Sequence, residues 1–537
     1  MNPLEFYLRS FFFSGVVEKL LPILLVVFLA RVVFPFVFAS DGPRHRRLEG
    51  VLGLGSVLAG LFAWQFMHLD HDEVEHLNCA WQVSQGLLPF RDFWQHHLPT
   101  LWFLLAPVTR LFDAGSSLLE TARLASLTIA LVSGVLAWKL SSRLHGGQAP
   151  SRAVFLFFWA AMLIPFQWNY IRPDLVAAPF VLTGLILLLS ASPDSLGIRF
   201  SAGLFLGIAL SLTPKVGFLL GCAALADAFC RPFPGIASAF RRLVALSAGV
   251  AAGLLPLALW LVRYDLVEAC LYGTFTFNRK FQSYQPPGGY IPVSLIFSTI
   301  VIWWRWPGTD PDERRRRGIL AAASIGSVVP MLLSPHKFLY HLQLSTLLLA
   351  TALAPSGEEA ARELVRKGKF VFLAVTCVVL LLPSQYYIRY AAWAPFYEKL
   401  VQIDILQSLA ERGPVSLIYP DHPILCKNAT GFDHAWFWNF LEFPVLHGDL
   451  QKPLGSFTEQ LISRRPLIIS SQNRIANFPF SRYPEQERTV LSSHLLKTGF
   501  IDRATRDRLQ GFLEKEYRLV NIVGVWFWLR NDIPKSF

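Results

Sequence analysis

Residues 68–76 carry the side chains of this chain that are best suited to proton transfer. They read HLDHDEVEH, so that carboxylates and imidazoles alternate. A positioned carboxylate or imidazole can take the proton of an attacking hydroxyl group, which is general base catalysis. On a helix, Glu75 and His76 would lie on the same side as Asp72, three and four residues further on. Glu75 would then raise the pKa of Asp72 and a protonated His76 would lower it, and the sequence leaves this balance open.

A metal site is the alternative chemistry for this segment. His68, His71, Asp72 and His76 are of the types that bind metal ions, but their spacing matches no recognised metal motif. The six cysteines are scattered and form no CxxC pair, so they indicate neither a metal site nor a disulfide framework. The sequence therefore predicts no metal and no other cofactor, with a divalent metal kept open as an alternative.

The residues that follow must position the acidic segment, and they predict two helices. Residues 72–85 suit an amphipathic helix on a membrane surface, with one mainly apolar face and one polar face. The first face holds Leu77, Ala80, Trp81 and Ser84, and the second holds Asp72, His76, Cys79 and Val83. Gly86 should end this helix, and PFRDF at 89–93 should turn the chain. Residues 99–113 predict a second apolar helix that is too short to span a membrane.

The composition indicates that most of the chain is built for lipid. Hydrophobic residues make up 53% of it and charged residues only 16%, whereas soluble proteins carry about 25% charged residues. The net charge of +12 could indicate nucleic-acid binding. The basic residues lie in short loops between apolar segments, however, which is the pattern that sets membrane topology. We therefore expect membrane lipids as partners and no nucleic acid.

Apolar segments of membrane-spanning length predict an all-α polytopic membrane domain with about 11–12 transmembrane helices. The candidate segments are 18–39, 50–68, 121–140, 153–169, 175–191, 199–213, 216–230, 243–262, 290–304, 318–333, 338–354 and 369–383. Five Lys and Arg clusters, among them Arg314–Arg317, lie between the first two spans, after the third, seventh and ninth spans, and before the last. Placing them in the cytoplasm puts 69–120, 170–174, 263–289, 334–337 and everything beyond 384 outside. The segment 18–39 is read as a span, with a signal peptide or an interfacial helix as alternatives.

The C-terminal part changes character and predicts a soluble α/β domain outside the membrane. Its apolar runs have strand length, at 415–419, 466–470 and 523–529, and helix-like stretches at 484–497 and 503–516 lie between them. The predicted domains are therefore an extra N-terminal membrane helix at 1–45, a transmembrane catalytic domain at 46–390 whose first outer loop is 69–120, and the α/β domain at 391–537.

The first outer loop resembles that of the GT-C superfamily, membrane glycosyltransferases that use polyprenyl-phosphate sugars. The resemblance rests on Asp72-Glu73, the helix, Gly86, Pro89-Phe90-Arg91-Asp92-Phe93 and His97-x-Pro99. Within this superfamily, the chain resembles bacterial enzymes that are similar to protein O-mannosyltransferases and to the aminoarabinose transferase of lipid A. Further agreement comes from Arg172-Pro173-Asp174, Thr213-Pro214-Lys215, Pro335-His336-Lys337 and Tyr340-His341. The family usually has Tyr where Phe90 stands, so that one hydroxyl group is lost here.

The resemblance implies transfer of a sugar from a polyprenyl-phosphate donor to an acceptor hydroxyl on a glycan, lipid or protein. It further implies an inverting single displacement at the outer face of a bacterial inner membrane. Asp72 matches the acidic position of the family and is the predicted general base. Glu73 lies about 100° further round a helix and would orient the loop or touch the sugar.

The departing polyprenyl phosphate gains negative charge, and this requires fixed cations. Among the basic residues at the ends of outer segments, which include Arg279 and Lys280, we expect phosphate contacts from Arg172, Lys215 and Lys337. The other residues predicted to shape the loop or to contact substrate are Glu75, His76, Arg91, Asp92, His97, Asp174, His336 and His341.

Three alternatives remain at this stage. A glycan ligase or polymerase would use a lipid diphosphate donor. A transporter or flippase should have charged residues in mid-span and inverted repeats, and the sequence has neither. A structural scaffold would not need the acidic loop. Individually, Asp72 could simply cap a helix, Arg172 could anchor the outer face, and Arg314–Arg317 are interpreted as a topology signal.

Overall fold

The computed structural model describes two compact units of the chain. The first is formed by 1–67, 123–258 and 286–392, and the second by 68–122, 259–285 and 393–537. The residues described are 71–111 except 94, 116–144, 170–192, 195–229, 235–279, 311–333, 343–348, 351–352, 363, 366–367, 369, 415–416, 462–463, 465–470, 503–522 and 525–534.

The described part of the first unit is helical. Its helices are α7 (Ser116–Leu144), which begins in the second unit, α9 (Pro173–Ser190), α10 (Leu196–Leu212), α11 (Val216–Phe229), α12 (Ile236–Arg263), which ends in the second unit, and α16 (Pro311–Leu333). A helix was predicted at each of these places. Residues 343–348 and 351–352 are also helical, within the predicted span 338–354. The segments 18–39, 50–68, 153–169 and 290–304, and nearly all of 369–383, lie outside the described residues.

Length and composition set three of these helices apart. Among the described residues, α7, α9 and α12 are long and apolar enough to cross a membrane, whereas α6 (Thr100–Leu111), α10 and α11 are apolar but shorter. Helix α9 shows why such a segment begins where it does. Arg172 is its extended N-cap, and Pro173 follows at the first helical position, where the missing N–H costs no hydrogen bond.

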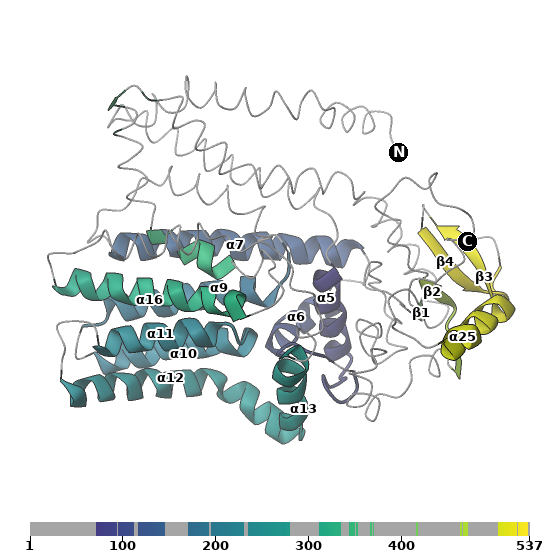
Figure 1. The fold of residues 1–537 in the computed structure, drawn as a ribbon, viewed down its shortest axis with the longest axis horizontal. Coiled ribbons are helices and arrows are strands. Elements are labelled where there is room, and N and C mark those ends of the chain that lie inside the picture. Colours follow the sequence, from purple (N-terminus) through teal and green to yellow (C-terminus); the bar gives the residue numbers. More distant parts are fainter. Residues whose placement is uncertain are drawn as a thin grey trace. The chain divides into compact units, whose positions relative to one another are not determined.

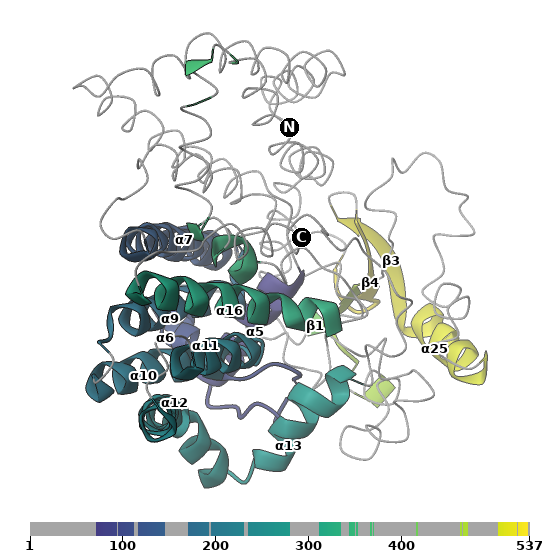
Figure 2. The same ribbon diagram turned by 60° about the vertical axis from the view of Figure 1, so that its left-hand side comes forward.

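Helices α10 and α12 pack with their backbones in direct contact. Both carry a Gly-x-x-x-Gly pair, Gly203 with Gly207 on α10 and Gly249 with Gly253 on α12. A Cβ atom on any of these glycines would collide with a backbone oxygen of the other helix. The two helices lie alongside one another, with α11 next to α10 (Figure 1), and Figure 2 shows the same neighbours after a rotation. Small residues of this spacing allow close helix approach in membranes.

A buried carboxylate joins four segments of the first unit. Asp227 on α11 accepts hydrogen bonds from Arg199 of α10, with Nε to Oδ2 at 2.7 Å, and from Arg315 of α16, with Nη2 to Oδ1 at 2.6 Å. Arg315 also donates to the carbonyls of Leu188 and Ala191 at the end of α9. All three charged side chains are buried. Arg315 belongs to the run that was interpreted as a topology signal, and this member of the run is a buried ion-pair partner.

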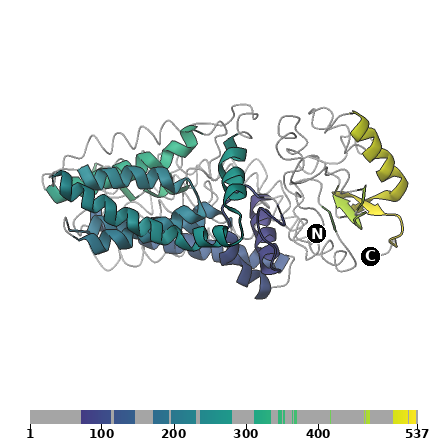
Figure 3. The same ribbon diagram turned by 90° about the horizontal axis from the view of Figure 1, so that it is seen from below.

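The second unit contains short helices and a small sheet. Helix α5 (His71–Ser84) packs on α6, and the end of α12 leads into α13 (Val267–Leu271) and the π-helix η2 (Tyr272–Phe277). Four strands, β1 (Val415–Ser416), β2 (Ile468–Ser470), β3 (Tyr517–Ile522) and β4 (Val525–Arg530), pair in the order β1-β2-β4-β3. Only β1 and β2 are parallel. Helix α25 (Arg503–Glu516) packs on β3 (Figure 3).

The C-terminal elements match the predicted strands and one predicted helix. Each of the three expected strand segments contains a strand, and 503–516 is a helix as predicted. Strand β3 was not predicted. The expected helix at 484–497 lies outside the described residues.

The glycine contacts predict a large effect of a single methyl group. Gly249→Ala would force α10 and α12 apart, and overpacking of this kind costs about 1–3 kcal/mol. Thermal unfolding of the detergent-purified protein measures the loss. Gly221→Ala on α11 is the matched control, because a Cβ there meets no atom within 4 Å. Equal unfolding temperatures for the two variants would contradict the close packing.

Removal of the charge of Asp227 should be more damaging. Asp227→Asn leaves two buried guanidinium groups without their carboxylate, and breaking a buried ion pair in this way costs about 3–5 kcal/mol. We expect a much lower unfolding temperature or a loss of folded protein in size-exclusion chromatography. Glu313→Gln on α16 removes a part-exposed i,i+4 partner of Arg317 and should cost about 0.5 kcal/mol. Wild-type stability of Asp227→Asn would overturn this role.

Candidate active site

Helix α5 carries the acidic segment, and it lies inside the protein. It begins with Asp72 and Glu73 in its first turn, where the helix dipole favours negative charge. It ends before Gly86, whose φ of +87° lies in the left-handed region that glycine adopts without strain. The predicted helix and its glycine stop are therefore confirmed.

The face of this helix that was expected to be polar and exposed is buried within the protein. Glu73, Glu75 and His76 are only 0%, 2% and 1% exposed, and Leu77 on the expected apolar face is equally buried. Both faces of α5 are buried, and α6 packs against it with Trp102 on the His76 side. Asp72 is the exception, since it is partly exposed. Buried carboxylates are costly unless hydrogen bonds or charges compensate them, so the surroundings of α5 must supply polar partners.

The PFRDF segment forms a tight turn held by its own side chains. Asp92 Oδ2 accepts a hydrogen bond from the Leu88 amide at 2.7 Å, and Arg91 pairs with the same carboxylate. The hydrogen bond from Arg91 holds the pKa of Asp92 below its usual value. Phe90 has a φ of +69°, which is a strained conformation for a bulky residue. Within the described residues, Arg91 and Asp92 thus shape the loop.

Three imidazole rings gather beside Glu75. The ring centroids of His96 and His97 are 3.9 Å apart, and those of His97 and His76 are 5.0 Å apart. His96 Nδ1 lies 3.8 Å from Glu75 Oε1. One ligand-type atom from each of Glu75, His96 and His97 lies within 4.8 Å of the others. This is a carboxylate–imidazole cluster of the kind that can hold a proton or a metal ion.

Protonation within this cluster is restrained by burial. Burial lowers the pKa of His96 well below its usual value, the charge of His97 lowers it further, and the charge of Asp72 acts against both. His96 is therefore neutral near pH 7. His76 accepts a hydrogen bond at Nδ1 from the indole N–H of Trp102, at 3.3 Å.

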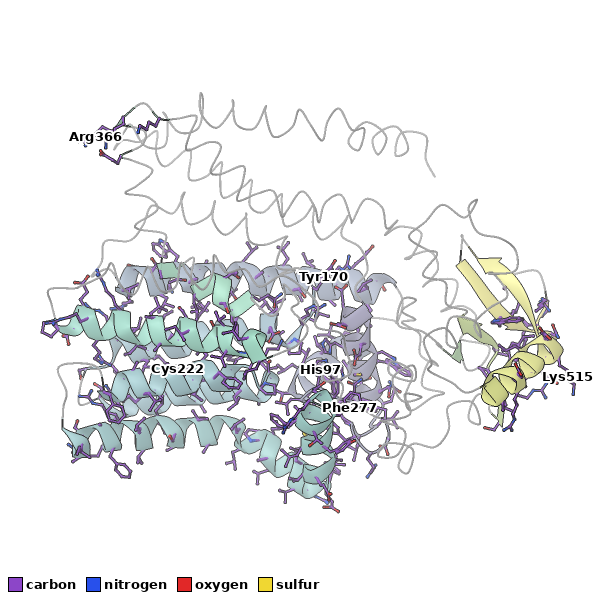
Figure 4. The ribbon with its side chains drawn as sticks, in the orientation of Figure 1. His97, Tyr170, Cys222, Phe277, Arg366 and Lys515 are labelled. Atoms are coloured by element: carbon purple, nitrogen blue, oxygen red, sulfur yellow. The ribbon has the colours of Figure 1, made fainter. Side chains whose placement is uncertain are left out.

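The π-helix η2 fixes the backbone of the histidine pair. Asn278, directly after η2, donates its side-chain amide to the His96 carbonyl at 2.9 Å. Gly273 lies so close that a Cβ there would be 2.5 Å from the Gln95 carbonyl oxygen. Phe277 meets the ring of His96 edge-on at 6.2 Å, and Phe277 and His97 are both labelled in Figure 4. Insertions of π-helix are frequent at functional sites.

Gln95, next to His96 in the sequence, contacts Cys79 of α5. Its side-chain amide donates to Cys79 Sγ at 3.0 Å. Burial raises the pKa of the Cys79 thiol well above its usual value, and the charge of Glu75 raises it further. Cys79, Cys222 and Cys270, the cysteines among the described residues, are free thiols.

A second polar group, in the first unit, joins two of the predicted site residues. Lys215 Nζ lies 2.6 Å from Asp174 Oδ2, and Thr213 donates to Asp174 Oδ1 at 2.9 Å. The Thr-Pro-Lys turn after α10 is thereby tied to the first turn of α9. Arg172, the N-cap of α9, is buried, whereas Lys215 keeps 32% of its side chain exposed.

The sequence therefore identified part of these groups. Glu75, His76 and His97 come together, and so do Asp174 and Lys215. Lys337, His336 and His341 lie outside the described residues. Sequence reasoning missed His96, Gln95, Trp102 and Asn278. The adjacent histidines in QHHLP at 95–99 were the one available signal, and only His97 was chosen.

The comparison with solved structures finds a protein whose fold resembles that of this chain. The chain is similar in structure to ArnT from Cupriavidus metallidurans bound to undecaprenyl phosphate, with a TM-score of 0.51 and 14% sequence identity. The match covers 72% of this chain and 85% of that one. At this identity the likeness is one of fold. No protein-family model matches the chain, and no curated protein matches its sequence.

The lowered pKa of His96 predicts a pH-dependent stability. The unfolded chain takes up a proton at this residue below about pH 6.5, before the folded protein does, so stability should fall as the pH drops through that range. His96→Gln removes this contribution. The loss of unfolding temperature between about pH 7.5 and about pH 5.5 should therefore be smaller in the variant than in wild type. An identical loss in both proteins would contradict the buried neutral state of His96.

Proposed function

We propose that this chain is a membrane glycosyltransferase that moves a sugar from a polyprenyl-phosphate donor to an acceptor hydroxyl. The observation that carries the proposal is the fold shared with ArnT, which was solved with undecaprenyl phosphate bound and 85% of which the match covers. The acidic helix α5, with its reactive side chains inside the protein, supports the same chemistry. Burial without function would be costly for so many ionisable groups.

Asp72 is the proposed general base. An acceptor hydroxyl must lose its proton as the new bond to the anomeric carbon forms, and a positioned base contributes about 10²–10⁴-fold to such a step. Asp72 is partly exposed, whereas Glu73 and Glu75 are buried. Asp72 is thus the α5 carboxylate that an acceptor can reach, and Glu73 is proposed to orient the helix start. The reaction is a single inverting displacement without a covalent intermediate.

The departing phosphate would be stabilised by cations at helix ends. Arg172, Lys215 and Lys337 are the proposed contacts, since fixed positive charge is most effective where negative charge develops. The ion pair with Asp174 supports a defined position for Lys215, while the exposed third of this side chain leaves room for a second anionic partner. Asp174 would then set the position of a phosphate-binding lysine.

The cellular setting completes the proposal. The enzyme would lie in a bacterial inner membrane as a multi-pass protein, with loop 69–120 and the α/β domain at 391–537 on the extracytoplasmic side. The acceptor would be a glycan, a lipid or a protein. The strands β1–β4 and helix α25 support an α/β fold for part of the C-terminal region.

Loss of the Asp72 carboxylate should abolish transfer. In a deletion strain of the source organism complemented with Asp72→Asn, we expect a fall in transfer rate of about 10²–10⁴-fold. Mass spectrometry should then show one envelope glycan or glycolipid lacking a sugar, together with accumulated polyprenyl-phosphate sugar. The mass difference would identify the sugar class.

Glu268→Gln is the matched control for this experiment. Glu268 is an exposed acid of α13 in the same unit, so the substitution removes one exposed negative charge from a different helix. Both variants are compared at equal protein levels, and Glu268→Gln should behave as wild type. Full complementation by Asp72→Asn would reject Asp72 as the base. Accumulated lipid diphosphate in the deletion strain would favour a ligase or polymerase, and unchanged glycans and lipids there would favour a transporter.

A further inference from the structure

Glu75, His96 and His97 combine the donor atoms of a transition-metal site. Their ligand-type atoms lie within 4.8 Å of one another, with Glu75 buried and both histidines partly buried. Two imidazole nitrogens and one carboxylate oxygen form a ligand set that proteins use for zinc, with one position left open. We propose that Glu75, His96 and His97 bind a divalent transition metal ion of the zinc class.

The ligands are held from two sides before any ion binds. Glu75 is fixed by its place on α5, which is buried along its length between Glu75 and Ala80. The histidine pair is fixed through its backbone, because Asn278 holds the His96 carbonyl and Gly273 lies against that of Gln95. A metal site gains affinity when the supporting residues orient its ligands in this way.

The remaining imidazole of the cluster has a different task. Nδ1 of His76 accepts the hydrogen bond of Trp102, so this nitrogen is not available as a ligand. Its ring stands edge-on to His97 and restricts how that ring can turn. His76 is therefore assigned a supporting position beside the three ligands.

Electrostatics favours a cation at this place. The Glu75 carboxylate is almost fully buried, and the negative charge of Asp72 acts on the same cluster. Buried charges are stabilised when they are paired or coordinate a metal. A divalent ion would offset both carboxylates and would tie α5 to the loop 95–97. This role is independent of the proposed transfer reaction, because the site can hold its ion without turnover.

Metal content gives the direct test. The full-length protein is purified in detergent, stripped with EDTA, incubated with excess zinc chloride and desalted. Mass spectrometry of the elemental content should then find about one zinc per chain. Glu75→Gln and His97→Gln should each weaken zinc binding by at least about 100-fold and leave little metal after desalting. Cys79→Ser is the matched control, since this thiol lies one turn further along α5 and contacts Gln95. This variant should retain the metal.

A second measurement, on the wild-type protein, does not depend on whether the variants fold. Zinc should raise the unfolding temperature of the stripped wild-type protein, because an ion that binds only the folded state stabilises it. Cobalt(II) in place of zinc should give visible absorption bands that excess zinc removes. Wild-type protein that retains no zinc and shows no thermal shift would overturn the proposal. Zinc retained at wild-type levels by folded Glu75→Gln and His97→Gln would do the same. Neither result depends on whether Asp72→Asn impairs sugar transfer.

Discussion

Helix α5 brings Glu73, Glu75 and His76 into the interior, and the elements around it are arranged to accommodate these groups. Trp102 of α6 donates its indole N–H to His76. The loop after the PFRDF turn brings Nδ1 of His96 to 3.8 Å from Oε1 of Glu75. The π-helix η2 then fixes that loop through Asn278 and Gly273. Because an uncompensated carboxylate in a dry environment is expensive, each of these contacts depends on the others being in place. Asp72 lies at the partly exposed end of the same helix. The contacts that hold α5 therefore also fix the position of Asp72.

The first unit meets the same requirement in a different way. Around Asp227, guanidinium groups from α10 and α16 and the terminal carbonyls of α9 form a hydrogen-bonded network. Away from that network, the glycines of α10 and α12 let two backbones touch, so that dispersion contacts and shape hold the helices together. Charge pairing and close packing thus act at separate places on the same helices. Both restrict how far α10 can shift relative to its neighbours.

The sequence predicted the helices well because length and apolar periodicity are local properties. The strand β3 was missed because Tyr517–Ile522 mixes polar and apolar residues and follows directly on α25. Burial of α5 was missed for a different reason. The amphipathic pattern of one helix cannot show that a second helix packs against its polar face. The cluster around Glu75 could not be predicted from the sequence either. His96 and Asn278 come from distant segments, and no spacing rule joins Glu75 to them. The pairing of Asp174 with Lys215 likewise depends on how α9 packs against α10.

The π-helix η2 also sets the rotational position of the residues that follow it. A π-turn accommodates one residue more than the α-helical turn that it replaces. If Tyr272–Phe277 formed an ordinary α-helix with the same number of residues, everything after it would be rotated by about 100°. Asn278 would then face away from His96, although no residue of the carboxylate–imidazole cluster had changed. The π-helical form of this short segment is therefore part of what builds the site.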